Sequence, residues 1–303
     1  MLAAAISLAC SGSHKQGERM IPYSDLTKSS ADPADQRIPY GTDPLQFGEL
    51  RLPGGNERVP IVVLIHGGCW QAQYDIKHIE PAASALTRDG FATWTVEYRR
   101  LGNPGGGWPG TFDDISRAVD YVRTLAAGNP RIDTARVVLM GHSAGGQLAL
   151  WAASRRQGEQ TGLFASSAPP IAVAGVVSLA GITDMAAYGA AAGGCNQSVT
   201  PLMGGTPAEQ AGHYAAVNPI ERLPTRVPVH LVHGDADPIV PIAQGTVFAT
   251  RDNAGGGTSV VDVVKGAGHF DLIAPQSDAW KTVLSAAHAL ADANLPPRVH
   301  AGP

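Results

Sequence analysis

The sequence is short of charge and of long apolar runs. Asp, Glu, Lys and Arg together make up 16% of the 303 residues, below the typical share of about 25%. The net charge is −4 and no basic run or stripe occurs, which argues against a nucleic-acid partner. No segment approaches the roughly 20 consecutive apolar residues of a membrane-spanning helix. We therefore expect neither nucleic-acid binding nor a membrane span.

Motifs for metals and cofactors are absent as well. No pair of histidines or cysteines has the spacing of metal ligands, and the sequence contains no P-loop. We expect no metal and no cofactor.

Cysteine is scarce, with three residues in the chain. Cys10 ends the apolar segment MLAAAISLAC, which fits the tail of an export signal or an ordinary disordered start. In a lipoprotein-type signal Cys10 would be the acylated residue. We expect an exported protein, with a cytoplasmic one as the alternative. Cys69 and Cys195 either form a disulfide or stay as two buried thiols, and the sequence leaves both open.

Apolar residues are plentiful, at 44% of the chain. They predict one α/β domain over 36–295 that follows a signal-like, poorly ordered segment 1–35 and precedes a tail at 296–303. Segments typical of strands are 47–52, 59–67, 91–98, 136–142, 173–181, 229–234 and 259–266. Helical patterns occupy 76–89, 111–126, 278–291 and the residues that follow Ser143. This alternation predicts a mostly parallel sheet with helices on both faces, and a lid or pocket rim at 182–224.

The segment Gly141-His142-Ser143-Ala144-Gly145-Gly146 has the pattern G-x-S-x-G between a strand and a helix. A sharp turn in that context presents the serine hydroxyl above the sheet, and the following helix N-terminus favours developing negative charge. Ser143 is the expected nucleophile.

The segment His66-Gly67-Gly68-Cys69-Trp70 follows another strand. Glycine lets backbone amides converge on an oxyanion without obstruction by side chains. We expect the amides of Gly68, Cys69 and Ala144 to form the oxyanion hole, and His66 to brace the loop by hydrogen bonds.

Two later loops supply a carboxylate and an imidazole. Asp235 and Asp237 both follow the strand at 229–234, and Asp235 is the better candidate for shaping the turn. His269, in Gly266-Ala267-Gly268-His269-Phe270-Asp271, lies on a glycine-flanked loop after the last strand. Asp237 is therefore the expected orienting carboxylate and His269 the general base.

With these motifs in view, residues 45–290 resemble the α/β-hydrolase superfamily, in which the triad follows the chain order Ser, Asp, His. The HGGCWQ segment is similar to the oxyanion segment of the branch that holds acetyl- and carboxylesterases, feruloyl-esterase-like proteins and arylformamidases (kynurenine formamidases). VEYRR at 96–100 resembles an N-Y-R segment of hormone-sensitive-lipase-type esterases, but Glu97 replaces the asparagine.

The resemblance implies a serine esterase that acts on a small-molecule ester with a short acyl or small aromatic group, through an acyl-enzyme on Ser143. Trp70 and Trp108 are candidate walls of the substrate pocket, whereas Tyr98 fits the core at least as well. The alternatives are an arylformamidase with the same triad and a non-catalytic binding protein on this fold.

Overall fold

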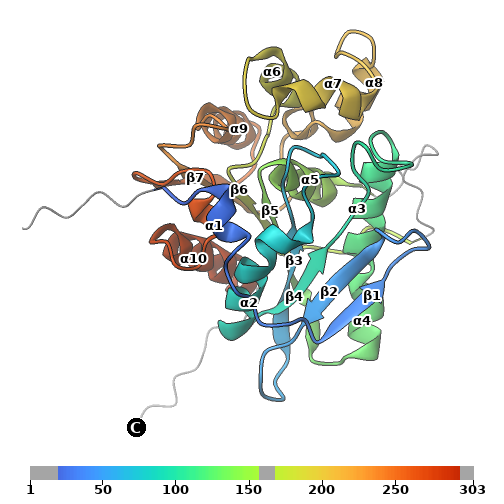
Figure 1. The fold of residues 1–303 in the computed structure, drawn as a ribbon, viewed down its shortest axis with the longest axis vertical. Coiled ribbons are helices and arrows are strands. Elements are labelled where there is room, and N and C mark those ends of the chain that lie inside the picture. The colour runs from blue at the N-terminus through green and yellow to red at the C-terminus, as the bar shows by residue number, and fades with distance from the viewer. Residues whose placement is uncertain (1–19, 157–167, 294–303) are drawn as a thin grey trace, which may run out of the picture.

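A computed structural model describes residues 20–156 and 168–293 of the chain (Figure 1). Within them, eight strands form one sheet in the order β1-β2-β4-β3-β5-β6-β7-β8, and all neighbours from β4 onward pair in parallel. The strands are β1 (Gln36–Pro39), β2 (Phe47–Arg51), β3 (Val59–Ile65), β4 (Ala92–Val96), β5 (Ile132–His142), β6 (Gly175–Leu179), β7 (Val229–Gly234) and β8 (Ser259–Val264). The α/β-hydrolase fold expected from the sequence is confirmed.

The central strands are apolar on both faces because helices cover both. In β3, Ile61, Val63 and Ile65 belong to one hydrophobic cluster, and Val62 and Leu64 belong to the other. All five side chains are buried, as the two-residue period of a strand between two helix layers requires.

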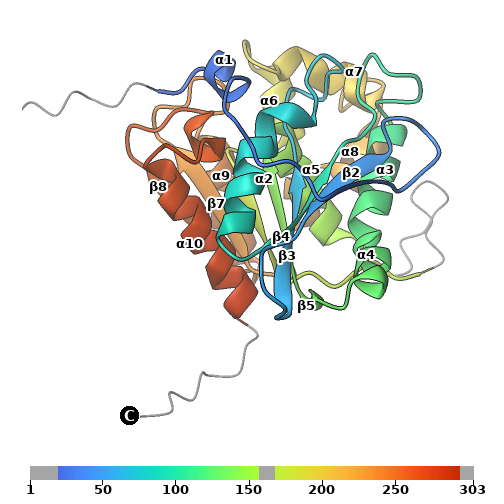
Figure 2. The ribbon, with the colours of Figure 1, turned by 60° about the horizontal axis from the view of Figure 1, so that its bottom comes forward.

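The helices divide between the two faces of the sheet (Figures 1 and 2). Apolar residues of α2 (Glu80–Arg88) and α10 (Ala279–Asp292) join one cluster. The other cluster contains residues of α3 (Gly110–Asp120), α4 (Val122–Gly128), α5 (Ala144–Ser154) and α9 (Ala243–Ala254). None of the helices within the described ranges is long and apolar enough to cross a membrane.

The segment 182–224 contains short helices and 3-10 turns. They are α6 (Met185–Ala190), α7 (Val199–Met203), α8 (Ala211–Val217) and the 3-10 turns η2 (Asn196–Ser198) and η3 (Pro219–Arg222). Two further 3-10 turns, η1 (Ile76–Ile79) and η4 (Asp271–Ile273), lie in loops on the sheet's C-terminal side.

The chain differs from the sequence-based expectation at four places. The helix expected over 111–126 is interrupted at Tyr121, between α3 and α4. The strand β1 and the helix α9 were not expected. The expectation of little order over 1–35 is wrong for its second half, which holds α1 (Tyr23–Leu26) and the start of the domain. Cys10 and the tail at 296–303 lie outside the described residues.

Candidate active site

The expected nucleophile lies at a strained turn. β5 ends at His142, α5 begins at Ala144, and Ser143 between them has φ 56° and ψ −119°. Residues other than glycine rarely adopt this backbone conformation, and such strain is typical of turns at functional sites. A Cβ on Gly145 would collide with the backbone oxygen of Ile65 in β3, so the glycine allows the first turn of α5 to approach the sheet.

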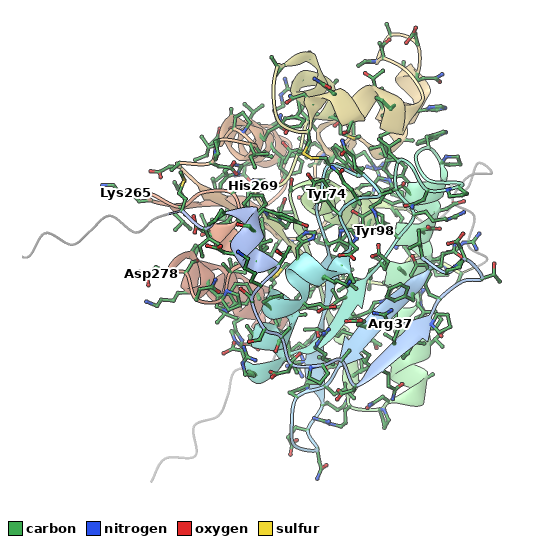
Figure 3. All side chains as sticks on the ribbon, in the orientation of Figure 1. Arg37, Tyr74, Tyr98, Lys265, His269 and Asp278 are labelled. Carbon is green, nitrogen blue, oxygen red and sulfur yellow. A yellow bond between two sulfur atoms is a disulfide. The ribbon has the colours of Figure 1, made fainter. Side chains whose placement is uncertain are left out.

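The imidazole and the carboxylate expected from the sequence are hydrogen-bonded. His269 Nδ1 donates to Asp237 Oδ2 at 2.7 Å, and His269 is 4% exposed. With the proton on Nδ1, Nε2 is left to accept one from a hydroxyl. Ser143 and His269 line the same cavity, and His269 is labelled in Figure 3. Three loops distant in the sequence thus bring the expected triad together.

Asp237 is held in its charged form. Its Oδ1 accepts the amides of Ile239 and Val240 at 2.7 and 3.0 Å. Burial alone raises the pKa of Asp237, but the hydrogen bond from His269 and these amides outweigh burial, so the pKa lies below its ordinary value. The neighbouring Asp235 is exposed and accepts the Gly266 amide at 2.5 Å. Asp235 therefore shapes the turn, as the sequence indicates.

The glycine-rich loop after β3 approaches the serine closely. A Cβ on Gly67 would lie 2.7 Å from the His142 backbone oxygen, and Gly68 has φ 103°. Gly68 and Cys69 line the cavity beside Ser143, and Ala144 is the first residue of α5. Among residues 20–156 and 168–293, the amides of Gly68, Cys69 and Ala144 have no hydrogen-bond acceptor. Free amides at the serine are what an oxyanion hole requires.

A buried charged cluster supports this loop from below. His66 Nδ1 donates to the Gly67 carbonyl at 2.8 Å, and His66 Nε2 accepts from Arg100 Nη1 at 3.1 Å. Burial and the Arg100 charge lower the pKa of His66 to about 3, so the imidazole is neutral. Tyr98 stacks on this ring and its hydroxyl donates to the His66 carbonyl at 2.8 Å. His66 braces the loop, as the sequence predicts.

Glu97 supplies the negative charge of this cluster. It forms an ion pair with Arg100 and accepts the amides of Ile76 at 3.1 Å and Tyr98 at 2.9 Å. The glutamate that replaces asparagine in the VEYRR segment therefore neutralises a buried guanidinium. A buried charge is retained only when it is paired and hydrogen-bonded.

A disulfide joins Cys69 to Cys195, with the two Cα atoms 4.9 Å apart. Cys69 belongs to the loop after β3, and Cys195 precedes η2 in the segment 182–224. Both half-cystines line the cavity that contains Ser143. The bond therefore fixes the rim segment to the loop that carries the free amides.

The cavity has a volume of about 300 Å³ and mostly aromatic and apolar walls. Its lining residues, besides the serine and the imidazole, are Tyr23, Gly68, Cys69, Tyr74, His78, His142, Gly194, Cys195, Ile239 and Phe270. The sequence indicated Cys69 and Cys195 near the site. It gave no pocket role to Tyr23, Tyr74, His78, Ile239 or Phe270. Of these, Phe270 could have been placed near the site, because it is the next residue after His269.

The pocket roles expected for the two tryptophans are wrong. Trp70 is fully buried, and its Nε1 donates to Gln147 Oε1 at 3.2 Å. Trp108 stacks on His213 with ring centroids 4.1 Å apart. Neither lines the cavity. Trp70 has φ 54°, a conformation that the sequence does not reveal and that a residue in a tight loop adopts when its side chain packs into the core.

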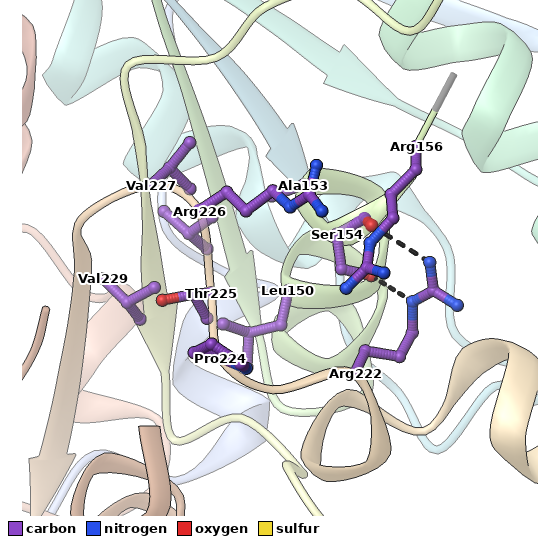
Figure 4. A pocket seen from close by; sticks show the side chains of 11 residues that line it. Leu150, Ala153, Ser154, Arg156, Arg222, Pro224, Thr225, Arg226, Val227 and Val229 are labelled. Carbon is purple, nitrogen blue, oxygen red and sulfur yellow. Dashed lines mark hydrogen bonds between the residues drawn. The ribbon is translucent and has the colours of Figure 1, made fainter. Parts of the chain in front are cut away.

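Two other hollows lack catalytic groups. Figure 4 shows the first, which has a volume of about 10 Å³ and room for roughly one water molecule. Arg222, in its wall, donates to the Oγ and backbone oxygen of Ser154. The second is a depression of about 460 Å³ that Gln71, Ser198 and Pro201 help to line, and it has no titratable side chain. In the described ranges, no three His, Cys, Asp or Glu residues are placed to hold a metal ion.

Comparisons with known proteins agree with this geometry. The family model described as BD-FAE matches residues 50–251. Esterase LipQ of Mycobacterium tuberculosis is 26% identical over 268 residues, which cover 78% of this chain and 57% of LipQ. Dipeptidyl peptidase family member 2 of Caenorhabditis elegans is 27% identical over 66% of this chain and 25% of its own length. The chain thus spans little more than half of the first relative and a quarter of the second.

Solved structures show the same fold. Esterase B from Lactobacillus rhamnosis superposes with a TM-score of 0.73 and 22% identity, over 89% of this chain and 90% of its own. A truncated carbohydrate esterase from gut microbiota gives a TM-score of 0.71 and 22% identity, over 86% of this chain and 99% of its own.

Proposed function

The chain belongs to the BD-FAE family, and from that premise we propose that it is a serine esterase that cleaves small carboxylic esters. The observation that carries the proposal is the convergence of Ser143, the hydrogen-bonded pair His269–Asp237 and free backbone amides on one cavity. The names of LipQ and esterase B support it as well.

The reaction proceeds in two steps. His269 Nε2 takes the proton of the Ser143 hydroxyl as its oxygen attacks the ester carbonyl, and the amides of Gly68, Cys69 and Ala144 stabilise the oxyanion. His269 then gives the proton to the departing alcohol, which leaves an acyl group on Ser143. A water molecule, deprotonated by His269, hydrolyses that acyl-enzyme. Asp237 keeps the Nδ1 proton in place and stabilises the imidazolium.

The size of the cavity supports small substrates. About 300 Å³ is at the lower end of ligand pockets, and the walls that surround Ser143 are mostly apolar and aromatic. A short acyl group or a small aromatic ester fits this volume better than a long-chain triglyceride.

The test is hydrolysis of p-nitrophenyl esters from acetate to decanoate by the wild type and by Ser143→Ala, with the exposed Ser30→Ala as control. We expect turnover by the wild type and the control, and a loss of about 10⁶ in kcat for Ser143→Ala. Equal rates for Ser143→Ala and wild type contradict the mechanism. Turnover of N-formylkynurenine by a wild type that is inert toward every ester replaces the esterase with an arylformamidase.

We also propose that the protein is exported. The Cys69–Cys195 disulfide supports this, because such bonds persist in oxidising compartments and are rare in the cytosol. The apolar segment that ends at Cys10 provides the second argument. Fractionation of expressing cells with wild type and Cys10→Ser tests both: a wild type found in the cytosol contradicts export, and equal solubility of the two argues against lipidation.

A further inference from the structure

The N-terminal strap, residues 20–26, packs against the loop that carries His269. Asp271, two residues beyond His269, accepts the Ile21 amide on Oδ1 at 3.0 Å and the Gly268 amide on Oδ2 at 2.5 Å. One buried carboxylate therefore connects the strap to the histidine loop. Leu26, at the other end of the strap, is 1% exposed and belongs to the hydrophobic cluster that α2 and α10 share.

Tyr23, in the middle of the strap, closes one side of the catalytic cavity. Its ring lies 5.5 Å from the ring of Tyr74 in an edge-on contact, 5.6 Å from Phe270 and 5.6 Å from His78. Such separations are those of favourable aromatic pairs. All four rings line the cavity that contains Ser143. Figure 2 shows α1, which contains Tyr23, at the same end of the molecule as α6 and α7 of the rim.

Tyr23 precedes the segment that matches the family model. The match to the BD-FAE family begins at residue 50, so the strap lies outside the segment that the family model matches. The ring of Tyr23, beside Tyr74 and Phe270, takes up volume in the cavity that a bound ester would otherwise occupy.

We propose that Tyr23 is a specificity-determining residue: from the N-terminal strap, its ring sets the size of the ester that reaches Ser143. The inference rests on the proposed esterase activity. The ring contributes by excluded volume and apolar contact. Burial, and the nearby carboxylate of Asp75, raise the pKa of the Tyr23 hydroxyl, so the side chain is a neutral phenol at working pH. The hydroxyl itself is not required for the size limit.

The experiment compares kcat/KM of wild type, Tyr23→Ala, Tyr23→Trp and the matched control Tyr23→Phe. One substrate series varies the acyl chain from acetate to octanoate with p-nitrophenol as the alcohol. The other keeps acetate and enlarges the alcohol from phenyl to naphthyl. Each methylene group newly accommodated in an apolar pocket is worth about fourfold. We therefore expect Tyr23→Ala to raise the ratio of large to small substrates by about tenfold or more in at least one series.

Tyr23→Trp should lower that ratio, and Tyr23→Phe should match the wild type. Ratios that do not change in either series, or that change equally in the alanine and phenylalanine variants, overturn the proposal while the esterase activity stands. A wild type inert toward the smallest ester refutes the esterase itself, and the inference with it. Thermal unfolding verifies that each variant is folded, and Tyr23→Leu replaces the alanine variant if that protein does not fold.

Discussion

Replacing Asp237 by asparagine should stop catalysis without disturbing the fold. The asparagine side-chain oxygen can accept the hydrogen bonds from the Ile239 and Val240 amides that Oδ1 of Asp237 accepts in the wild type. Its amide nitrogen then faces His269 Nδ1, which now donates to Oδ2 at 2.7 Å. Two donors cannot share that contact, so the imidazole proton moves to Nε2. The nitrogen that must accept the Ser143 proton is then blocked.

The expected loss in kcat is about 10⁴, or about 5.5 kcal/mol of transition-state stabilisation. The assay is steady-state hydrolysis of p-nitrophenyl acetate, with the melting temperature measured on the same samples. Asp235→Asn is the matched control, because this carboxylate lies two residues away and binds only the Gly266 amide. Its kcat should remain near that of the wild type. An Asp237→Asn enzyme that keeps a tenth of the wild-type kcat, or a control that loses as much, refutes the tautomer argument.

Two predictions concern stability. Cys195→Ser opens a loop closed across a sequence separation of 126, so the free energy of unfolding should fall by about 5 kcal/mol; an unchanged urea midpoint contradicts this. His78 is buried, and burial together with the nearby His66 lowers its pKa to about 3, whereas an unfolded histidine titrates near 6.5. Its contribution is fully present above about pH 6.5 and is lost as the pH falls toward 3, by about 2 kcal/mol at pH 5. His78→Gln should remove that loss of stability. Urea titrations of both proteins at pH 7 and pH 5 measure the free energy of unfolding, and an equal pH dependence in wild type and variant contradicts the prediction.

The sheet and the expected triad follow from local sequence because their signals are local. A strand buried on both faces is a continuous β-branched run, as Val59–Ile65 shows. The serine turn needs small residues at fixed spacing, and Gly145 reveals it. The strand β1 gave no such signal, because Gln36–Pro39 lies at the sheet edge and is mostly exposed.

The substrate walls could not be predicted, because they depend on contacts between distant segments. Tyr23 meets Phe270, and the hydrogen bond that secures the strap joins residues 250 positions apart. Trp108 looked like a pocket residue because its loop is rich in glycine and proline. The ring instead stacks on His213. Nothing in the sequence around either residue predicts this contact.

The strap has a consequence for how the proposed substrate choice of this protein can be changed. It precedes every strand of the sheet. It is held by the Ile21 amide on Asp271, by the apolar side chain of Leu26 and by the ring contacts of Tyr23. Exchange of residues 20–26 between relatives, as a cassette, therefore replaces a wall of the binding site and leaves the strands that carry the chemistry unaltered.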